Sequence, residues 1–183
     1  LYHAMHYPDT WGAAASHAAD MGFDLLFPPE FPTVCSVLVE YDGDPEAFLR
    51  TFWRRNQPSG HDYTTLMILA MAASYDPDPA APSRIRLPFD LRTCRLEPER
   101  WSRWLQYDPL SMLERREAAL RSLHALHIDV GRFDQYNIQF GTRRFAWIGS
   151  HSRCTVPSPT SHTTLATSPG RTPEARSSSM QSM

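Results

Sequence analysis

The stretch from Asp108 to Asp134 limits the possible folds most, because it joins an amphipathic helix directly to a short apolar strand. Asp108 followed by Pro109 is typical of a helix start, with a capping carboxylate and a proline at the first helical position. Leucines then recur at helical spacing, at Leu110, Leu113, Leu120 and Leu123. The apolar run 126–130 follows at once. A helix that feeds a short apolar strand is half of a βαβ unit, so the sequence predicts an α/β protein with a mostly parallel sheet.

Asp134 is the candidate functional residue that this arrangement suggests. The strand is expected to stop at Gly131, which leaves Asp134 in the loop just past the carboxyl end of the strand. In open α/β sheets, ligands and catalytic groups gather at that end. Asp is also a common turn residue, because its side chain bonds to nearby backbone groups. Two interpretations of Asp134 are therefore open, a functional carboxylate or a residue that only shapes the loop.

A second strand is predicted near the start of the chain. Residues 1–7 carry the apolar spacing of a helix that Pro8 ends, and residues 11–16 are typical of a buried strand of small side chains. His17 and Asp20 follow the end of this strand. The chain begins without Met and inside the helix, with no capping residue, so we expect that a preceding part is missing.

Prolines interrupt the region from Phe23 to Arg95 repeatedly, at Pro28, Pro29, Pro32, Pro58, Pro77, Pro79, Pro82 and Pro88. Long regular elements cannot cross that many prolines, so this region is expected to be a lid over a sheet edge and not a separate domain. Two helices are predicted within it, one that begins at Asp44-Pro45 and one over 64–74. Beyond the lid, Trp101 and Trp104 share a helix face and are expected to pack in the core.

The composition changes abruptly after Ala146. Residues 147–183 are dominated by Ser, Thr, Pro, Arg and His and have almost no apolar periodicity. Such a segment buries too little surface to offset its ordering entropy, so it is predicted to be a disordered tail. The folded part is therefore expected to be one domain, residues 1–146.

The overall composition argues against several classes of function. A net charge of −2 at pH 7 gives no electrostatic basis for binding nucleic acid or an anionic membrane, and no apolar run approaches the length of a membrane span. All 18 Lys+Arg side chains are Arg, which excludes Schiff-base and P-loop lysine chemistry within these residues. Three widely spaced cysteines favour neither a disulfide framework nor a zinc site, and they fit a reducing, cytoplasmic setting. No cofactor is indicated.

Two other groups of polar side chains suggest chemistry at first sight. Ser16 and His17 resemble a nucleophile and its base, but neighbours in an extended segment point to opposite faces, so we expect that they do not meet. His3, His6, His17 and Asp20 offer metal-binding groups. The first two lie on a helix that also needs a buried face, and no further ligand set is evident, so no metal site is predicted.

Three parts of the sequence resemble the α/β-hydrolase esterases of the enterochelin-esterase and S-formylglutathione-hydrolase type, namely residues 1–20, 64–74 and 108–146. The run Leu-Tyr-His-Ala-Met-His-Tyr-Pro-Asp-Thr-Trp-Gly-Ala-Ala-Ala-Ser is similar to the helix and strand that follow the nucleophile elbow of that family. Residues 129–134, Asp-Val-Gly-Arg-Phe-Asp, are similar to the strand and loop that present its acid, with Asp134 in the place of the acid. The resemblance implies a partial α/β-hydrolase fold and hydrolysis of a small carboxylic ester or thioester through an acyl-serine intermediate.

The sequence departs from that family at both other members of the triad. It has no Gly-x-Ser-x-Gly elbow, which is expected just before Leu1. The base should follow the acid by about thirty residues. His162 is the histidine nearest to that distance, and His151 lies earlier, but neither has the expected helix and strand around it. The change after Ala146 is what a slipped reading frame would produce. We therefore expect the chain to be catalytically inactive.

A non-catalytic α/β interaction module is the alternative that the residues leave open. In that case an exposed edge of the half-sheet would recruit a partner strand, or a second copy of the chain. An α/β domain without any site is the third possibility.

Overall fold

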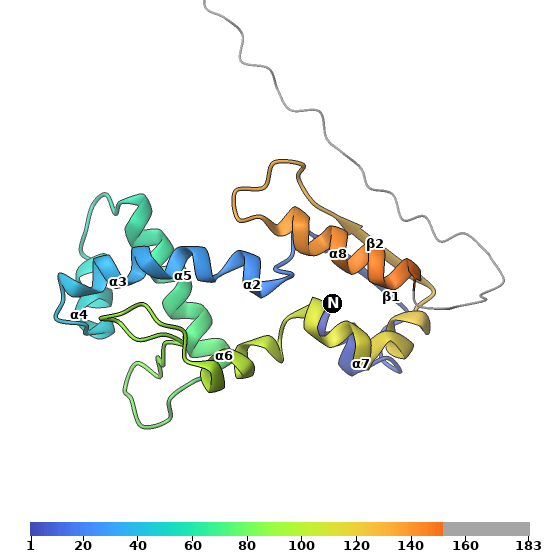
Figure 1. Ribbon diagram of the computed structural model, residues 1–183, viewed down its shortest axis with the longest axis horizontal. Helices are drawn as coiled ribbons and strands as arrows, with labels where there is room; N and C mark the ends of the chain where they lie inside the picture. The colour runs from blue at the N-terminus through green and yellow to red at the C-terminus, as the bar shows by residue number, and fades with distance from the viewer. Residues whose placement is uncertain (152–183) are drawn as a thin grey trace, which may run out of the picture.

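The computed structural model describes residues 1–151 as two lobes (Figure 1). The helical lobe is residues 23–107, and the strand lobe is residues 1–22 together with 108–151. The elements in chain order are α1 (Tyr2–His6), β1 (Ala13–His17), α2 (Phe23–Leu26), the short 3-10 helix η1 (Pro28–Glu30), α3 (Phe31–Val39), α4 (Pro45–Phe52), α5 (Gly60–Tyr75), α6 (Pro98–Leu105), α7 (Pro109–Arg121), β2 (Ala125–Asp129) and α8 (Ile138–His151).

The two strands pair in parallel, with Ala13 opposite Ala125 and His17 opposite Asp129. The helical lobe and α7 lie between them in the sequence, so the connection is the long crossover that parallel strands require. Residues 1–151 therefore combine helices with a small parallel sheet of two strands, in agreement with the predicted mixture of helix and parallel strand.

The two cap-plus-proline signals mark helix starts as predicted. Asp44 accepts the N–H of Glu46 at the start of α4, and Asp108 accepts the N–H of Leu110 at the start of α7. The helix predicted over 64–74 is longer at its N-terminal end, because Ser59 and Asp62 form a reciprocal capping box that starts α5 at Gly60.

The prolines from 28 to 32 do not prevent regular structure, so that part of the prediction was wrong. Pro28 begins the single turn of η1, and Pro32 lies in the first turn of α3. A proline there loses only an N–H that would have no helical partner, so the helix continues to Val39. The chain from 77 to 88, which contains Pro77, Pro79, Pro82 and Pro88, is irregular as expected.

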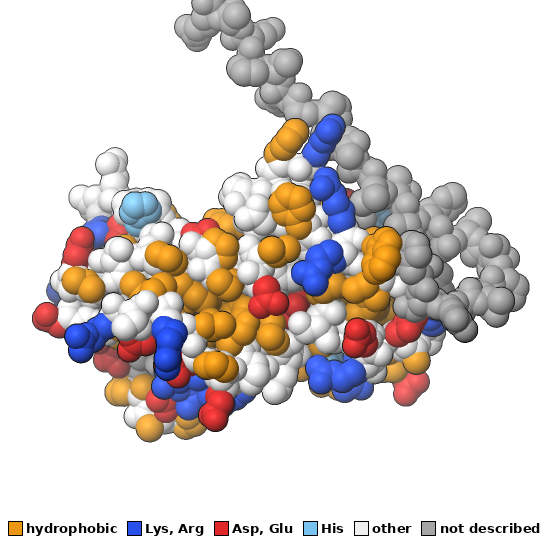
Figure 2. Space-filling view, viewed as in Figure 1, with side chains coloured by type: hydrophobic (Ala, Val, Ile, Leu, Met, Phe, Trp, Pro, Cys, Tyr) orange, Lys and Arg blue, Asp and Glu red, His pale blue; other side chains and the backbone are white. Residues whose placement is uncertain are grey.

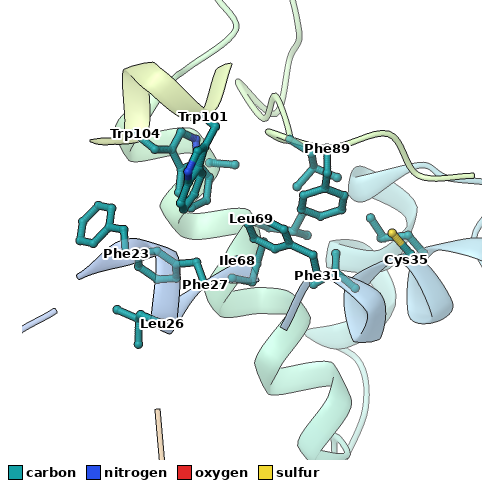
Figure 3. Close-up of a cluster of buried hydrophobic side chains, with 14 of the residues drawn as sticks. Phe23, Leu26, Phe27, Phe31, Cys35, Ile68, Leu69, Phe89, Trp101 and Trp104 are labelled. Atoms are coloured by element: carbon teal, nitrogen blue, oxygen red, sulfur yellow. The ribbon is translucent and has the colours of Figure 1, made fainter. Parts of the chain in front are cut away.

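The helical lobe is built around a large hydrophobic core, which Ile138 of α8 joins from the strand lobe (Figure 3). The rings of Phe31 and Phe89 stack with centroids 4.3 Å apart, and Trp104 is fully buried beside them. Trp101 is buried as well, and its Nε1 donates to Asp24 at 2.9 Å. The core packing expected for the two tryptophans is confirmed, and the region expected to act as a lid is a packed helical unit.

A second hydrophobic cluster fixes the strand lobe. It joins Met5 of α1, Met112 and Leu113 of α7, and Phe145 of α8, and Ile128 of β2 packs against it. These helices therefore cover one face of the strand pair, while the alternate residues of β1, including His17, are exposed. On the side shown in Figure 2, apolar side chains extend across the middle of the molecule, and most charged side chains lie toward its periphery.

Asp108 closes the helical lobe at its base. Its carboxylate accepts the N–H of Gly22 at 2.9 Å and that of Phe23 at 3.4 Å, although these residues lie more than eighty positions earlier. The same buried carboxylate caps α7 and accepts the hydroxyl of Ser111 at 2.9 Å. The chain therefore enters and leaves the helical lobe at one point.

The predicted tail lies almost wholly outside the described residues. Helix α8 continues past Ala146 to His151, and Ile148 packs against the cluster of the strand lobe. His162 and the rest of 152–183 are not described. Across residues 1–151, no helix combines the length and the apolar character needed to cross a membrane.

Candidate functional site at the carboxyl edge of the strand pair

Both strands end at the same edge of the sheet because they run in parallel. Past β1 come Ala18 and Asp20, and past β2 comes the loop that contains Asp134. The backbone N–H of Ala18 donates to the carbonyl of Asp129 at 2.9 Å, which carries the ladder one step beyond the last strand residue. This edge gathers the polar side chains described below.

Asp134 shapes its own loop and still has an oxygen to offer. Its Oδ1 accepts the N–H of Tyr136 at 2.9 Å and that of Ile138 at 3.3 Å, which orients the carboxylate at the start of α8. Asn137 between them has a φ of 64°, the left-handed conformation that Asn tolerates. Oδ2 of Asp134 has no hydrogen-bond partner among the side chains that the structure describes. The loop-shaping interpretation is therefore realised, and it leaves the functional one open.

Asp20 lies within electrostatic reach of Asp134. Burial, and then the negative charge of Asp134, raise the pKa of Asp20 above its ordinary value. Burial, and then the charges of Asp20 and Asp108, raise the pKa of Tyr75 to about 12, so its hydroxyl stays protonated at neutral pH. Asp20 therefore lies within electrostatic range of both Asp134 and the protonated Tyr75.

Three further side chains converge on the exposed face of the strand pair. His17 Nδ1 donates to Asp129 Oδ1 at 2.7 Å, and His127 Nε2 lies 3.4 Å from Asp129 Oδ2. The hydrogen bond from His17, more than the one from His127, holds the pKa of the Asp129 carboxyl below its ordinary value. We name these three residues the His–Asp cluster.

The His–Asp cluster was not predicted from the sequence. His127 and Asp129 are two residues apart on a strand, a spacing that places both side chains on one face. That signal is present in the sequence, but the third member depends on the register, which sets His17 opposite Asp129. Register cannot be read from two short strands separated by a long crossover.

The other candidates do not assemble into a site. Ser16 is buried and His17 is exposed, so the two neighbours face opposite sides of β1 as expected. His3 and His6 remain on α1, where His6 Nδ1 bonds the carbonyl of Tyr2 at 3.0 Å. Asp20 contacts Asp134 electrostatically and not these histidines.

The chain matches no protein-family model and no curated protein. The residues at the carboxyl edge of the strand pair, and their resemblance to the esterase pattern, therefore carry the functional proposal.

Proposed function

We propose that this chain is the acid-bearing part of a serine esterase of the α/β-hydrolase type, which acts on carboxylic esters or thioesters. The observation that carries the proposal is the place of Asp134. It follows a parallel strand at the carboxyl edge, and its carboxylate is oriented by two backbone N–H groups while Oδ2 has no partner in the described part of the chain. That is the place the esterase resemblance gives to the triad acid.

The chemical role of Asp134 follows from its geometry. A triad acid accepts the Nδ1–H of the catalytic histidine, which fixes the tautomer and stabilises the imidazolium that forms when the serine loses its proton. Because Tyr136 and Ile138 hold Oδ1, the carboxylate would present Oδ2 to that histidine without losing its orientation. Asp20, when it is ionised, would favour the same imidazolium.

The nucleophilic serine would lie on a polypeptide segment outside residues 1–183, because residues 1–183 contain no Gly-x-Ser-x-Gly. The base would be His162, which lies outside the described residues. The 183-residue chain by itself should therefore hydrolyse no ester.

The coding DNA tests the proposal directly. Immediately upstream of Leu1 it should encode a strand that ends in Gly-x-Ser-x-Gly. In one of the two alternative frames past Ala146 it should encode an apolar strand and a histidine. An upstream sequence without the elbow would overturn the esterase assignment. If neither alternative frame encodes the strand and histidine, only the frame-slip hypothesis fails.

Turnover of a p-nitrophenyl ester is the second test. The purified chain should not exceed the buffer rate, whereas a version extended to include the elbow and the restored frame should. In the extended version, Asp134→Asn should lower kcat by about 10³- to 10⁴-fold. Asp9→Asn, a change at an exposed turn residue after α1, is the matched control and should leave kcat unchanged. Equal values of kcat in Asp134→Asn and Asp9→Asn would show that Asp134 is not the triad acid.

An interaction module is the second candidate, and the outer edges of the strand pair favour it. Within residues 1–151, neither β1 nor β2 has a strand partner other than the other. Unpaired strand edges recruit partner strands or further copies of the same chain. Light scattering of the purified chain distinguishes the outcomes, because a module gives a complex of fixed stoichiometry and a broken enzyme gives aggregation that grows with concentration.

A further inference from the structure

We propose that the His–Asp cluster, His17, His127 and Asp129, binds a divalent transition-metal ion of the zinc class. Each residue offers one ligand atom, and these three atoms lie within 4.8 Å of one another. The proposal does not depend on the esterase assignment, because it uses neither Asp134 nor any residue outside the strands.

The backbone brings the three ligands together and holds them. His17 and Asp129 are register partners at the last position of the parallel pair, so their side chains leave the sheet on the same face. His127 precedes Asp129 by two residues on the same strand and therefore shares that face. All three ligands belong to strands, which place side chains more reproducibly than loops do.

The ligand spacing is close to what one ion needs. Zn–N and Zn–O bonds of about 2.0–2.2 Å in a tetrahedral site place neighbouring ligand atoms about 3.3 Å apart. His17 Nδ1 lies 2.7 Å from Asp129 Oδ1, and His127 Nε2 lies 3.4 Å from Asp129 Oδ2. The two imidazole nitrogens lie no more than 4.8 Å apart, so they would have to approach by up to about 1.5 Å to share one ion.

The chemistry of the ligands selects the class of ion. Two imidazoles and one carboxylate suit Zn²⁺, Co²⁺ and Ni²⁺, whereas Mg²⁺ and Ca²⁺ prefer sites made only of oxygen. The set is open on one side, because the His17 side chain is 67% exposed and that of Asp129 is 30% exposed. An open site with three protein ligands leaves a coordination position for water or an exogenous ligand.

Metal titration of the full chain tests the proposal, with Zn²⁺ and Co²⁺ as probes and calorimetry as the readout. We expect one site per chain, and we expect His17→Ala, His127→Ala and Asp129→Asn each to weaken its affinity at least tenfold. His124→Ala is the matched control, because His124 is an exposed histidine just before the opposite end of β2 and should leave the affinity unchanged. Far-UV circular dichroism checks that each variant retains its helix content.

The Co²⁺ absorption spectrum distinguishes this site from binding to thiols. Imidazole and carboxylate ligands give visible bands alone, whereas binding at any of the three cysteines, Cys35, Cys94 or Cys154, adds a thiolate charge-transfer band in the near ultraviolet. Visible bands that disappear in the His17→Ala/His127→Ala double variant support the site. Binding that survives the double variant, that falls equally in His124→Ala, or that shows only the thiolate band overturns it.

Discussion

Gly141 of α8 lies directly against the backbone of Met21. A Cβ atom on Gly141 would overlap the carbonyl oxygen and carbon of Met21, and it would reach within 3.1 Å of the Gly22 nitrogen. The segment after β1 and the helix after the Asp134 loop therefore pack backbone to backbone. This contact fixes the distance between the two segments that carry the carboxylates of the candidate site.

Gly141→Ala should therefore destabilise the fold. The added methyl group meets backbone, which cannot move aside as a flexible side chain would, so we expect a loss of about 2–3 kcal/mol in the free energy of unfolding. Urea denaturation followed by circular dichroism measures it. Gly149→Ala is the control on the same helix. A Cβ there meets nothing within 4 Å, so the higher helix propensity of Ala should leave stability unchanged or raised by up to about 1 kcal/mol. Equal effects of the two substitutions would contradict the packing.

Asp108→Ala should cost more stability than the loss of a helix cap. Asp108 accepts three backbone N–H groups and a hydroxyl from a buried position, so its removal leaves several buried donors unpaired. We expect a loss of about 3 kcal/mol. Asp44→Ala removes the same kind of cap in an exposed setting and should cost about 1 kcal/mol. The difference between the two losses, measured by urea denaturation, reports the closure of the helical lobe, and no difference would argue against it.

Asp76 should govern part of the acid denaturation. Burial opposes ionisation of its carboxyl, but hydrogen bonds from Arg103 and Arg86 outweigh burial and lower its pKa. A carboxyl with a lowered folded pKa stabilises the fold above its unfolded pKa, and that contribution disappears as pH falls through the folded pKa.

The variant Asp76→Asn should lose about 2–3 kcal/mol at pH 7, less than for a fully buried pair, because the two arginine side chains are 30% and 39% exposed. As pH falls through the lowered folded pKa of Asp76, the stability of the variant should approach that of the parent chain. Thermal unfolding across the acid range measures both. A constant difference at all pH values would show that the loss comes from packing and not from ionisation.

The ionised carboxyl of Asp20 should destabilise the fold, whereas that of Asp76 stabilises it. The pKa of Asp20 is raised, so its ionised form is disfavoured in the folded state, and it subtracts stability as pH rises above its unfolded pKa. Asp20→Asn should therefore raise the melting temperature at pH 7 and should have little effect near pH 3. If the neighbour responsible is Asp134, the gain should be smaller in a chain that already carries Asp134→Asn. An identical rise in melting temperature in both chains would show that Asp134 does not influence the ionisation of Asp20.

The elements that were predictable carry local signals. Asp44-Pro45 and Asp108-Pro109 each place a capping oxygen and a preset φ where a helix must begin, and the structure begins helices there. Helix α3 was not predicted, because Pro32 was expected to interrupt regular structure. A proline in the first turn of a helix does not destabilise that helix, and Pro32 lies in the first turn of α3. The core of the helical lobe was not predictable in the same way, because Phe31 meets Phe89 through a contact that spans many residues.

The same contrast between local signals and long-range contacts applies to the candidate site. The loop position of Asp134 follows from one strand, which ends at Asp129, and from Gly131 just after it, both close to Asp134 in sequence. The proximity of Asp134 to Asp20 and the contact of His17 with Asp129 both depend on the pairing of β1 with β2. In the sequence, five α-helices and the 3-10 helix η1 lie between β1 and α7, the helix that leads into β2. A single sequence contains no direct record of such a pairing.

The hydrogen bond from Gly22 to Asp108 brings the two ends of the helical lobe to one point. A segment whose two ends meet can be lengthened at little entropic cost to the remainder, since closing a longer loop costs only slightly more than closing a short one. Ile138 of α8 packs into the core of this lobe, so the side chains that meet it must be kept. Insertions into the irregular stretch 77–88 should therefore leave β1, β2 and their carboxyl edge in register.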